Sequence, residues 1–309
     1  MPKKKILASP SSIGKIDNLP FDLLAKSNYE VIKNPFGRKL TIEETIKLAK
    51  DCVGIVAGVE TLDKYVIDSL PNLKCISRVG VGMDSVDIEY ANSNGIKVLN
   101  TPDGPTRAVA EITIGLAFSL LRKIPQAHMD MKNSIWKKQT GNLLKDKKVG
   151  IVGLGRIGKT TANLFKSLGN TVFAHDLFPD NNWTKKNRIK ILDLNSLCSK
   201  CDIISLHIPG NANGKPVITH KELSLMKETV LIINVARGGV INEDDLYNFL
   251  KYNELSSAAI DVFEEEPYNG KLCKLKNVVL TPHIGSYAKE GKLKMEVQAV
   301  QNLINALKK

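Results

Sequence analysis

The sequence GLGRIGKT, which begins at Gly153, constrains the fold of this chain more than any other segment. It follows the apolar run VGIV, and its glycines let the backbone turn and approach a phosphate at the start of the next helix. Gly153, Gly155 and Gly158 match the dinucleotide-binding pattern G-x-G-x-x-G. The same segment matches the P-loop pattern G-x-x-x-x-G-K-S/T through Lys159 and Thr160. Both patterns predict a strand, a tight loop and a helix, but they predict different nucleotides.

An acidic residue further along the chain helps to separate the two interpretations. The dinucleotide pattern requires a carboxylate at the end of the next strand, about 20 residues on, to bind a ribose hydroxyl. Asp176 meets this requirement at the end of TVFAHD. Leu177 and Phe178 follow it instead of an arginine that could pair with a 2′-phosphate, so the sequence favours NAD over NADP. The P-loop interpretation needs a magnesium ligand, which Asp176 or Asp261 could supply, and these residues alone leave it open.

The rest of the chain alternates apolar strands with amphipathic helices, which predicts parallel sheets covered on both faces. With 309 residues, the chain exceeds the length at which a single core usually divides. We expect a first α/β domain from residues 1–100 and 285–309, to which a helix near Tyr287–Lys308 returns. A second domain, residues 101–284, carries the nucleotide loop. The long apolar helix Thr106–Leu121 is expected to be buried between layers or at a subunit interface.

Composition excludes several classes of protein. The formal net charge is +12, but the lysines are dispersed and no nucleic-acid-binding motif accompanies them, so no nucleic-acid partner is expected. The only N-terminal apolar run, Ile6–Ala8, is too short for a signal peptide or a membrane span, which predicts a cytoplasmic protein. Cys198 and Cys201 form C-x-x-C without a second ligand pair. We interpret them as reduced, partly buried thiols and expect no metal site.

Three polar residues follow the apolar strands of the second domain. Arg237 ends VLIINVARGG, Glu266 follows SAAIDVF, and His283 ends NVVLTPH. The carboxyl ends of parallel strands face the ligand crevice, so these side chains should converge beside the cofactor. Arginine binds a carboxylate, histidine exchanges a proton near neutral pH, and a glutamate paired with it would stabilise the imidazolium and orient the ring. Each residue alone is explained as well by capping or by surface exposure; together they predict catalysis.

These segments resemble the D-isomer-specific 2-hydroxyacid dehydrogenases over nearly the whole chain. The matching stretches, in order, are SRVGVGMDSVD, NTPDGPTRAVAE, VGIVGLGRIGK, SLHIP, NVARGGVINEDDL, AAIDVFEEEP and TPHIGS. The resemblance implies two Rossmann-like, doubly wound parallel-sheet domains with the active site in the cleft between them. It also implies NAD as cofactor, a small 2-hydroxy or 2-keto acid as substrate, and a homodimer built through the nucleotide-binding domains. The P-loop match is then a coincidence.

The resemblance also implies a role for each matching residue. His283 is the proton donor and acceptor, Glu266 is its partner, and Arg237 anchors the substrate. Asp261 would hold the nicotinamide carboxamide. Backbone N–H groups of Val79 and Gly80 would bind the substrate carboxylate, beside Arg78. The residues expected at the cofactor are Val81, Gly153, Gly155, Arg156, Ile157, Gly158, Asp176, His207, Ile208, Pro209, Val235, Ala236, Arg237, Asp261, His283 and Gly285.

Within this family the chain looks most like short 3-phosphoglycerate dehydrogenases, which implies a place in serine biosynthesis. Arg78, Lys137 and Lys138 are the candidate cations for a phosphorylated substrate. Because the sequence stops at Lys309, the regulatory extension of many such enzymes is expected to be absent, and with it feedback control by serine. Short members also reduce glyoxylate or hydroxypyruvate, and these substrates remain alternatives. A further alternative is a non-catalytic, NAD-sensing protein like the related corepressors.

Overall fold

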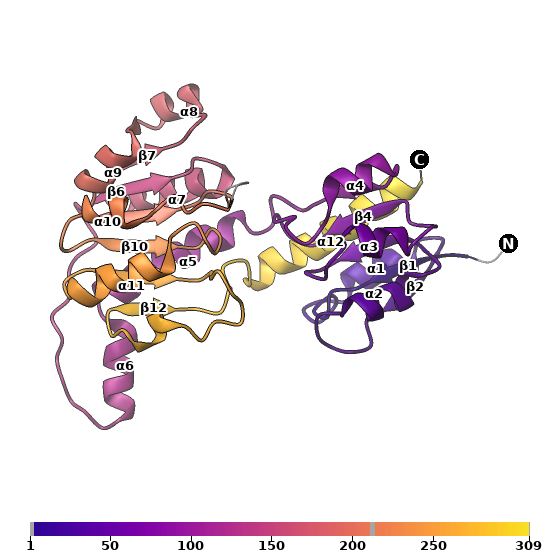
Figure 1. The fold of residues 1–309 in the computed structure, drawn as a ribbon, viewed down its shortest axis with the longest axis horizontal. Helices are drawn as coiled ribbons and strands as arrows, with labels where there is room; N and C mark the ends of the chain where they lie inside the picture. Colours follow the sequence, from indigo (N-terminus) through magenta and orange to yellow (C-terminus); the bar gives the residue numbers. More distant parts are fainter. Residues whose placement is uncertain (1–2, 211–213, 309) are drawn as a thin grey trace. The chain divides into compact units, whose positions relative to one another are not determined.

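The computed structural model describes residues 3–210 and 214–308, and there the chain forms two compact α/β units (Figure 1). Unit 1 contains the residues up to Pro105 and those from Ser286 onward. Unit 2 is Thr106–Gly285. Each unit has its own all-parallel sheet with helices on both faces, so the predicted Rossmann-like architecture is confirmed.

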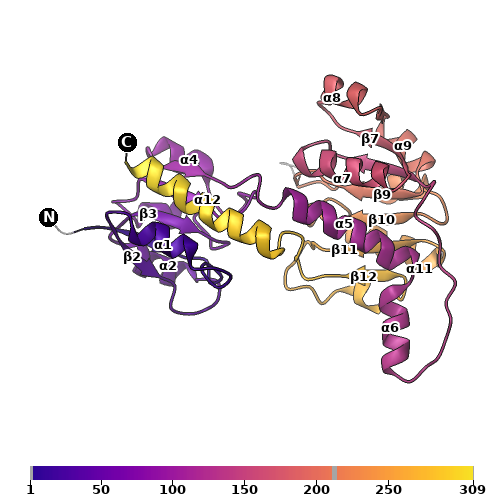
Figure 2. The ribbon, with the colours of Figure 1, turned by 180° about the vertical axis from the view of Figure 1, so that it is seen from behind.

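Unit 1 contains a five-stranded sheet with the order β2-β1-β3-β4-β5. Its strands are β1 (Lys4–Ala8), β2 (Tyr29–Lys33), β3 (Cys52–Ala57), β4 (Cys75–Arg78) and β5 (Lys97–Leu99). Its helices are α1 (Leu19–Ala25), α2 (Ile42–Ala49), α3 (Lys64–Asp68), α4 (Ile88–Ser93) and α12 (Lys289–Leu307). Helices α1 and α12 cover one face and α2 to α4 the other; Figure 2 shows α12 running along the sheet. The central strand β3 is therefore buried along its whole length.

Capping side chains determine where helices of unit 1 begin. The Glu44 N–H donates to the Thr41 hydroxyl, and the Thr41 N–H donates to the Glu44 carboxylate, so α2 starts with a capping box. Helix α4 begins at Ile88, because the Asp87 side chain accepts a hydrogen bond from the Tyr90 N–H and caps its amino end.

Unit 2 contains a seven-stranded sheet with the order β12-β11-β10-β9-β6-β7-β8. Its strands are β6 (Lys148–Val152), β7 (Thr171–His175), β8 (Lys190–Ile191), β9 (Ile203–Leu206), β10 (Leu231–Asn234), β11 (Ser257–Ile260) and β12 (Val278–Leu280). Its helices are α5 (Thr106–Leu121), α6 (Ile124–Lys132), α7 (Arg156–Ser167), α8 (Asn181–Lys186), α9 (Leu194–Lys200), α10 (His220–Ser224), α11 (Glu243–Tyr252) and the 3-10 helix η1 (Lys271–Lys274). The two-residue strand β8 was not predicted, because it is too short to show a periodic pattern.

Two apolar cores lie on opposite faces of the unit 2 sheet. Helices α9, α10 and α11 close one core. Helices α5 and α7 close the other, where Phe165 of α7 is completely buried. The apolar helix expected over Thr106–Leu121 is α5, and it packs against α7 and strands β10 to β12. Most of its side chains are therefore sheltered inside unit 2, although Phe118 remains exposed.

The C-x-x-C cysteines lie inside the first of these cores. Cys198 belongs to α9 and Cys201 follows its last residue, and both are fully buried and free. Burial raises the pKa of each thiol to about 12, so both stay protonated at neutral pH. A protonated, inaccessible thiol is a poor nucleophile and a poor metal ligand. The two residues pack as small apolar side chains.

No helix within residues 3–210 and 214–308 combines the length and the apolar character needed to cross a membrane.

Candidate functional site

The order of strands in unit 2 reverses between β6 and β9. In open parallel sheets, ligands bind outside the carboxyl ends of the strands at such a point. The loop after β6 begins with Gly153 and the loop after β9 with His207. A Cβ atom at Gly153 would lie 2.6 Å from the His207 carbonyl oxygen and 2.7 Å from Ile208 Cγ2, and φ at this glycine is +94°. Only glycine lets these two loops meet, and they are the loops predicted to bind the cofactor.

The start of α7 has the geometry of a phosphate site. Gly155 caps the helix without any side-chain hydrogen bond, and a Cβ placed on it would meet only open space. Gly158 packs so tightly that its Cβ would lie 1.9 Å from the Gly153 carbonyl oxygen. The N–H groups of the first helical turn therefore face outward without a side chain in front of them, as binding of a pyrophosphate requires. Arg156 and Ile157 are the first two residues of this helix.

Side chains that a P-loop would need for catalysis have other partners here. Lys159 Nζ lies 2.7 Å from Asp180 Oδ2 and above the Trp183 ring. The Thr160 hydroxyl donates to the carbonyl oxygen of Arg156 within α7. These contacts point both side chains away from the loop, and the dinucleotide interpretation is the one that the geometry supports.

Asp176 lies next to the glycine-rich loop, at the end of β7. Its Oδ2 accepts a hydrogen bond of 2.6 Å from the Leu154 N–H, and its Oδ1 accepts one of 2.8 Å from the Phe178 N–H. These bonds fix the carboxylate and leave part of its accepting capacity for a hydroxyl pair. Leu177 and Phe178 are exposed beside it. The residues present therefore fit the adenosine half of NAD.

His207 is a partly buried imidazole in this region. Its Nε2 lies 2.8 Å from the Ser205 hydroxyl, and its Nδ1 is buried. Burial lowers the pKa of His207 to about 3, because an imidazolium there would lose its hydration. The ring is neutral at physiological pH and does not serve as a cation for phosphate. Ile208 is partly buried and Pro209 exposed beyond it.

The predicted contact between His283 and Glu266 is present in the loops that follow β12 and β11. His283 Nδ1 lies 2.9 Å from Glu266 Oε2 and 3.0 Å from Oε1. A carboxylate only accepts hydrogen bonds, so Nδ1 carries the proton and Nε2 is left to face a reacting group. Both side chains are partly exposed, at 48% and 38%. The pair is therefore accessible to a small ligand.

A buried carboxylate holds the histidine loop in place. Asp261, at the end of β11, is 1% exposed and accepts hydrogen bonds from the Thr281 hydroxyl at 2.6 Å and from the Ile284 and Gly285 N–H groups at 2.9 and 2.8 Å. These bonds enclose His283, whose φ of +53° is unusual for a residue other than glycine. The structure thus gives Asp261 a positioning role that the sequence did not suggest. Its contact with the carboxamide stays a prediction.

Arg237 follows β10, next to the strand that carries Asp261. Its Nη1 donates to the Ala236 carbonyl oxygen at 2.8 Å, and the side chain is partly buried. A Cβ at Gly238 would lie 1.8 Å from the Phe263 carbonyl oxygen, so this turn packs directly on the loop that carries Glu266. Val235 and Ala236 are buried just before it. The backbone thus brings the arginine turn and the glutamate loop together.

The loop after β4 in unit 1 corrects one prediction. The Val79 N–H donates to the Ala57 carbonyl oxygen at 2.8 Å, which extends the sheet, and the Gly80 N–H donates to the Thr101 hydroxyl at 2.7 Å. These groups are not available to a substrate carboxylate. In the part of the chain that the structure describes, the N–H groups of Val81 and Gly82 have no such partner. Val81 and Gly82, two residues further on, therefore present the N–H groups of this loop that no backbone acceptor uses.

The three candidate phosphate cations are divided between the two units. Arg78 belongs to unit 1, where its Nη1 donates to the Val79 carbonyl oxygen at 2.6 Å. Lys137 and Lys138 belong to unit 2, in the exposed segment after α6. No feature within the described residues of either unit gathers these three side chains.

Comparison with known proteins identifies the family. The family model for the D-isomer specific 2-hydroxyacid dehydrogenase, NAD binding domain, matches residues 114–285. The chain belongs to this family. It is 35% identical to a D-3-phosphoglycerate dehydrogenase of Archaeoglobus fulgidus over 99% of this chain and 57% of that protein. It is 32% identical to a hydroxypyruvate reductase of Thermotoga maritima over 93% and 96% of the two chains.

A solved structure shows the same fold. A protein of Thermus thermophilus superimposes with a TM-score of 0.89 over 98% of this chain and 97% of that chain, at 29% identity. The chain spans only about half the length of the curated D-3-phosphoglycerate dehydrogenases that it matches, between 49% and 57%. The dehydrogenase family and the fit of Gly155, Gly158 and Asp176 agree on NAD as the cofactor.

Removing the charge at Asp176 should relax the choice of cofactor. Asp176→Asn keeps an oxygen acceptor for the loop but no longer repels a 2′-phosphate. We expect the preference for NADH over NADPH, measured as the ratio of dissociation constants from fluorescence titration, to fall roughly tenfold or more. The control is Asp146→Asn, which removes a charge before β6 at a residue with a φ of +66° that asparagine tolerates. An equal preference for NADH over NADPH in Asp176→Asn and Asp146→Asn would contradict this role of Asp176.

His207 should make the stability of this chain sensitive to acid. Its folded pKa of about 3 lies below the unfolded value of about 6.5, so below pH 6.5 the unfolded chain gains a proton that the folded chain refuses. This residue should therefore lower the free energy of unfolding as the pH is lowered, by up to about 1.4 kcal/mol per pH unit. Urea titrations between pH 7.5 and 5 should show that the free energy of unfolding declines less steeply in His207→Gln than in the wild type. The exposed control His128→Gln should retain the slope of the wild type; an unchanged slope in His207→Gln would refute the assignment.

Proposed function

We propose that this chain is an NAD-dependent dehydrogenase that interconverts a D-2-hydroxy acid and its 2-keto acid. The observation that carries the proposal is the pair of His283 and Glu266, with 2.9 Å between Nδ1 and Oε2, in a family whose domain binds NAD. Bound NAD would supply or accept the hydride. The candidate 2-keto acids are phosphohydroxypyruvate, hydroxypyruvate and glyoxylate.

The residues of this chain account for the remaining steps. During reduction, His283 would donate a proton from Nε2 to the substrate oxygen, while Glu266 stabilises the imidazolium through Nδ1. During oxidation, the same nitrogen takes the proton back. The Arg237 guanidinium would bind the substrate carboxylate, because its planar pair of donors matches two carboxylate oxygens.

We assign the two units different parts of this task. Unit 2 would bind NAD at the crevice between β6 and β9 and provide the proton-transfer pair. Unit 1 would contribute the N–H groups of Val81 and Gly82, which are neutral donors suited to a carboxylate. Val81 is 38% exposed, and its carbonyl oxygen is held by the Asn100 side chain at 2.9 Å, so the loop presents a fixed surface.

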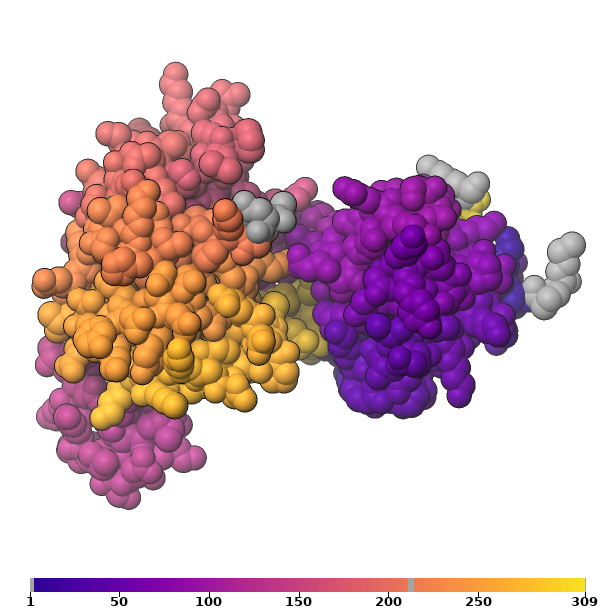
Figure 3. Space-filling model, in the orientation of Figure 1, coloured from indigo at the N-terminus to yellow at the C-terminus, as the bar shows by residue number. Residues whose placement is uncertain are grey.

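We also propose that the dehydrogenase is a homodimer that assembles through α6 and the segment after it. None of the residues of α6 is buried, and Figure 3 shows its segment standing out from the body of unit 2. Its exposed apolar side chains, with those of the segment that follows, are Ile124, Met129, Met131, Ile135, Trp136 and Leu143. Trp136 is 80% exposed, so it is not packed within its own chain. An apolar surface of this kind is typical of a protein interface.

Substituting the catalytic pair should separate chemistry from cofactor binding. His283→Ala should lower kcat for reduction of a 2-keto acid by about two to four orders of magnitude, because no other group gives the proton. Glu266→Gln should lower kcat by roughly one to three orders and change its pH profile. Glu265→Gln is the matched control, and fluorescence titration should show that NADH still binds to all three variants. Rates like those of the wild type in His283→Ala would refute the proposal, as would NADH binding without turnover of any candidate acid.

A charge placed in the apolar surface should dissociate the homodimer. We expect the wild type to be dimeric and Trp136→Glu to be largely monomeric in light scattering at micromolar concentration, because burying the carboxylate costs several kcal/mol. Phe178→Glu is the control, since Phe178 is 90% exposed elsewhere on unit 2. A monomeric wild type, or a dimeric Trp136→Glu, would rule out this interface.

A further inference from the structure

Asn234 is the last residue of β10 and comes immediately before the turn that carries Arg237. Its side chain is 3% exposed and contacts this turn twice. Oδ1 accepts a hydrogen bond of 3.1 Å from the Ala236 N–H, and Nδ2 donates one of 3.1 Å to the Arg237 carbonyl oxygen. One side-chain amide thus spans the turn and pairs backbone groups that burial keeps from water.

The arginine side chain is tied to the same turn. Arg237 Nη1 donates to the Ala236 carbonyl oxygen at 2.8 Å, so the guanidinium binds the peptide group between these two residues. Asn234 binds the backbone on either side of that peptide group. A Cβ at Gly238 would lie 1.8 Å from the Phe263 carbonyl oxygen, which limits the turn at its other end. The position of the guanidinium therefore depends on the turn that Asn234 holds.

The main chain of Asn234 is itself fixed in the sheet. Its carbonyl oxygen accepts a hydrogen bond of 2.9 Å from the N–H of Asp261, the buried carboxylate that holds the His283 loop. Asparagine is suited to this place, because an amide provides both an acceptor and a donor without a charge that would face Asp261. The arginine turn and the histidine loop are thus held from adjacent strand ends.

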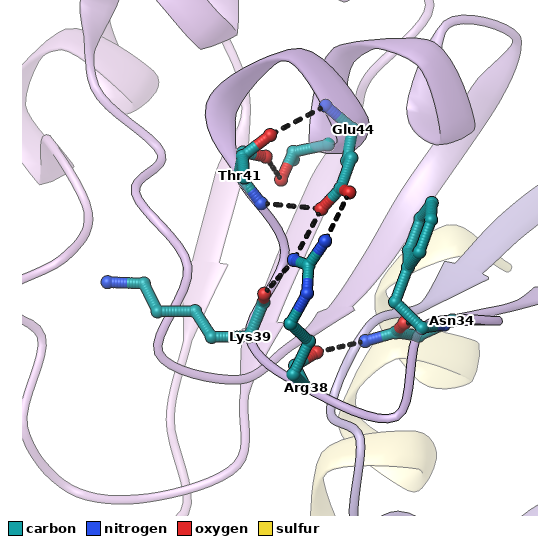
Figure 4. Close-up of polar contacts among 7 residues, drawn as sticks. Asn34, Arg38, Lys39, Thr41 and Glu44 are labelled. Carbon is teal, nitrogen blue, oxygen red and sulfur yellow. Dashed lines mark hydrogen bonds and ion pairs between the residues drawn. The ribbon is translucent and has the colours of Figure 1, made fainter.

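Unit 1 shows what a turn of this kind does with its arginine (Figure 4). Asn34 follows β2, and its Oδ1 accepts a hydrogen bond of 2.9 Å from the Phe36 N–H, again two residues on. Its Nδ2 donates to the Arg38 carbonyl oxygen at 2.8 Å. The Arg38 guanidinium makes two hydrogen bonds to the Glu44 carboxylate, at 2.7 and 2.9 Å. In this chain, an asparagine-held turn already presents an arginine to a carboxylate.

We propose that Asn234 is a positioning residue for substrate binding, because its side chain holds the turn from which Arg237 meets the substrate carboxylate. The inference rests on the proposed function and names a residue that acts on the substrate only through Arg237. In a turn without this amide, the guanidinium would adopt several positions, and fixing one of them would cost part of the binding free energy. Loss of Asn234 should therefore weaken substrate binding more than it slows the chemical step.

The first test uses saturating NADH and measures two constants: KM for a 2-keto acid, and the dissociation constant of oxamate, a stable mimic of such an acid. Asn234→Leu keeps the volume but removes both hydrogen bonds. Both constants should rise roughly tenfold, with kcat changed by less than about threefold. Asn234→Ser keeps an acceptor for the Ala236 N–H but is too short to span the turn, so both constants should rise roughly threefold.

The matched control is Asn170→Leu. Asn170 is 8% exposed, its Nδ2 donates to the Leu144 carbonyl oxygen, and it precedes β7 at the amino edge of the same sheet. Thermal unfolding shows whether each variant is folded. Asn170→Leu should lower the thermal stability and leave both constants as in the wild type. Equal rises in Asn170→Leu and Asn234→Leu would assign the effect to a general loosening of unit 2 and overturn the inference.

A double-mutant cycle shows whether Asn234 acts through Arg237. In Arg237→Gln the turn has no guanidinium to position. Adding Asn234→Leu to this variant should change the dissociation constant of oxamate by less than about twofold, against roughly tenfold in the wild-type background. The same factor in both backgrounds would contradict the proposed role. Asn234→Ser serves in the same cycle if Asn234→Leu does not fold.

Hydrogen exchange tests the turn itself and needs no substrate. The Ala236 amide should exchange at least about tenfold faster in Asn234→Leu than in the wild type, because its acceptor is gone. An unchanged rate would mean that the side chain does not hold the turn, and the inference would fail.

These measurements separate the inference from the proposed function. Oxamate binding that depends jointly on Asn234 and Arg237 supports the inference even if no 2-keto acid is reduced, a result that would refute the proposed function alone. Turnover by the wild type together with an unchanged KM in Asn234→Leu would overturn the inference and leave the proposed function standing. A wild type that neither binds oxamate nor reduces a 2-keto acid would refute both.

Discussion

Close approach of backbone atoms at Gly153 and Gly158 is the constraint on which the cofactor half of the molecule depends. A methyl group at Gly158 would overlap the Gly153 carbonyl oxygen, and one at Gly153 would overlap the loop after β9. The absence of side chains brings two loops and a helix start together at the point where the strand order reverses. The Leu154 N–H then orients Asp176 beside them. One short segment thus sets the geometry of a whole binding edge.

The proton-transfer pair depends on a different kind of interaction. Asp261 is buried and accepts three hydrogen bonds from the segment around His283, so the carboxylate of the neighbouring strand holds the loop that carries the imidazole. The left-handed backbone of His283 costs energy, which these hydrogen bonds offset. Glu266 fixes the ring from the other side. The exposed His283 and Glu266 pair therefore depends on the buried Asp261 carboxylate for its position.

Much of this arrangement was predictable from the sequence, because it follows from local patterns. Apolar runs predicted the long strands, and the glycine spacing predicted the loop and the start of α7. The contact between His283 and Glu266 was predicted because both residues follow strands of one parallel sheet. Tertiary hydrogen bonds could not be predicted in this way. Val79 continues the sheet and Gly80 binds Thr101, and neither bond leaves a signal in the motif itself.

The burial of polar residues could not be predicted from the sequence either. Glu60 occurs in an ordinary loop sequence, and only the meeting of β1 with β3 reveals that its carboxylate is enclosed. A glutamate after a strand usually faces solvent, so its burial cannot be read from residue type. The signal that could have indicated it is the preceding Gly58, which gives the carboxylate room.

The return of α12 to unit 1 has a consequence for synthesis. Unit 2 is an insertion in unit 1, and all of it leaves the ribosome before the last helix does. Ala299, Val300 and Leu303 of α12 are fully buried against the first sheet, and the Ser77 hydroxyl donates to the Ala299 carbonyl oxygen. The first sheet to be translated is thus the last to complete its core. In a nascent chain, unit 2 could therefore complete its core while the strands of unit 1 still lack the helix α12 that packs on them.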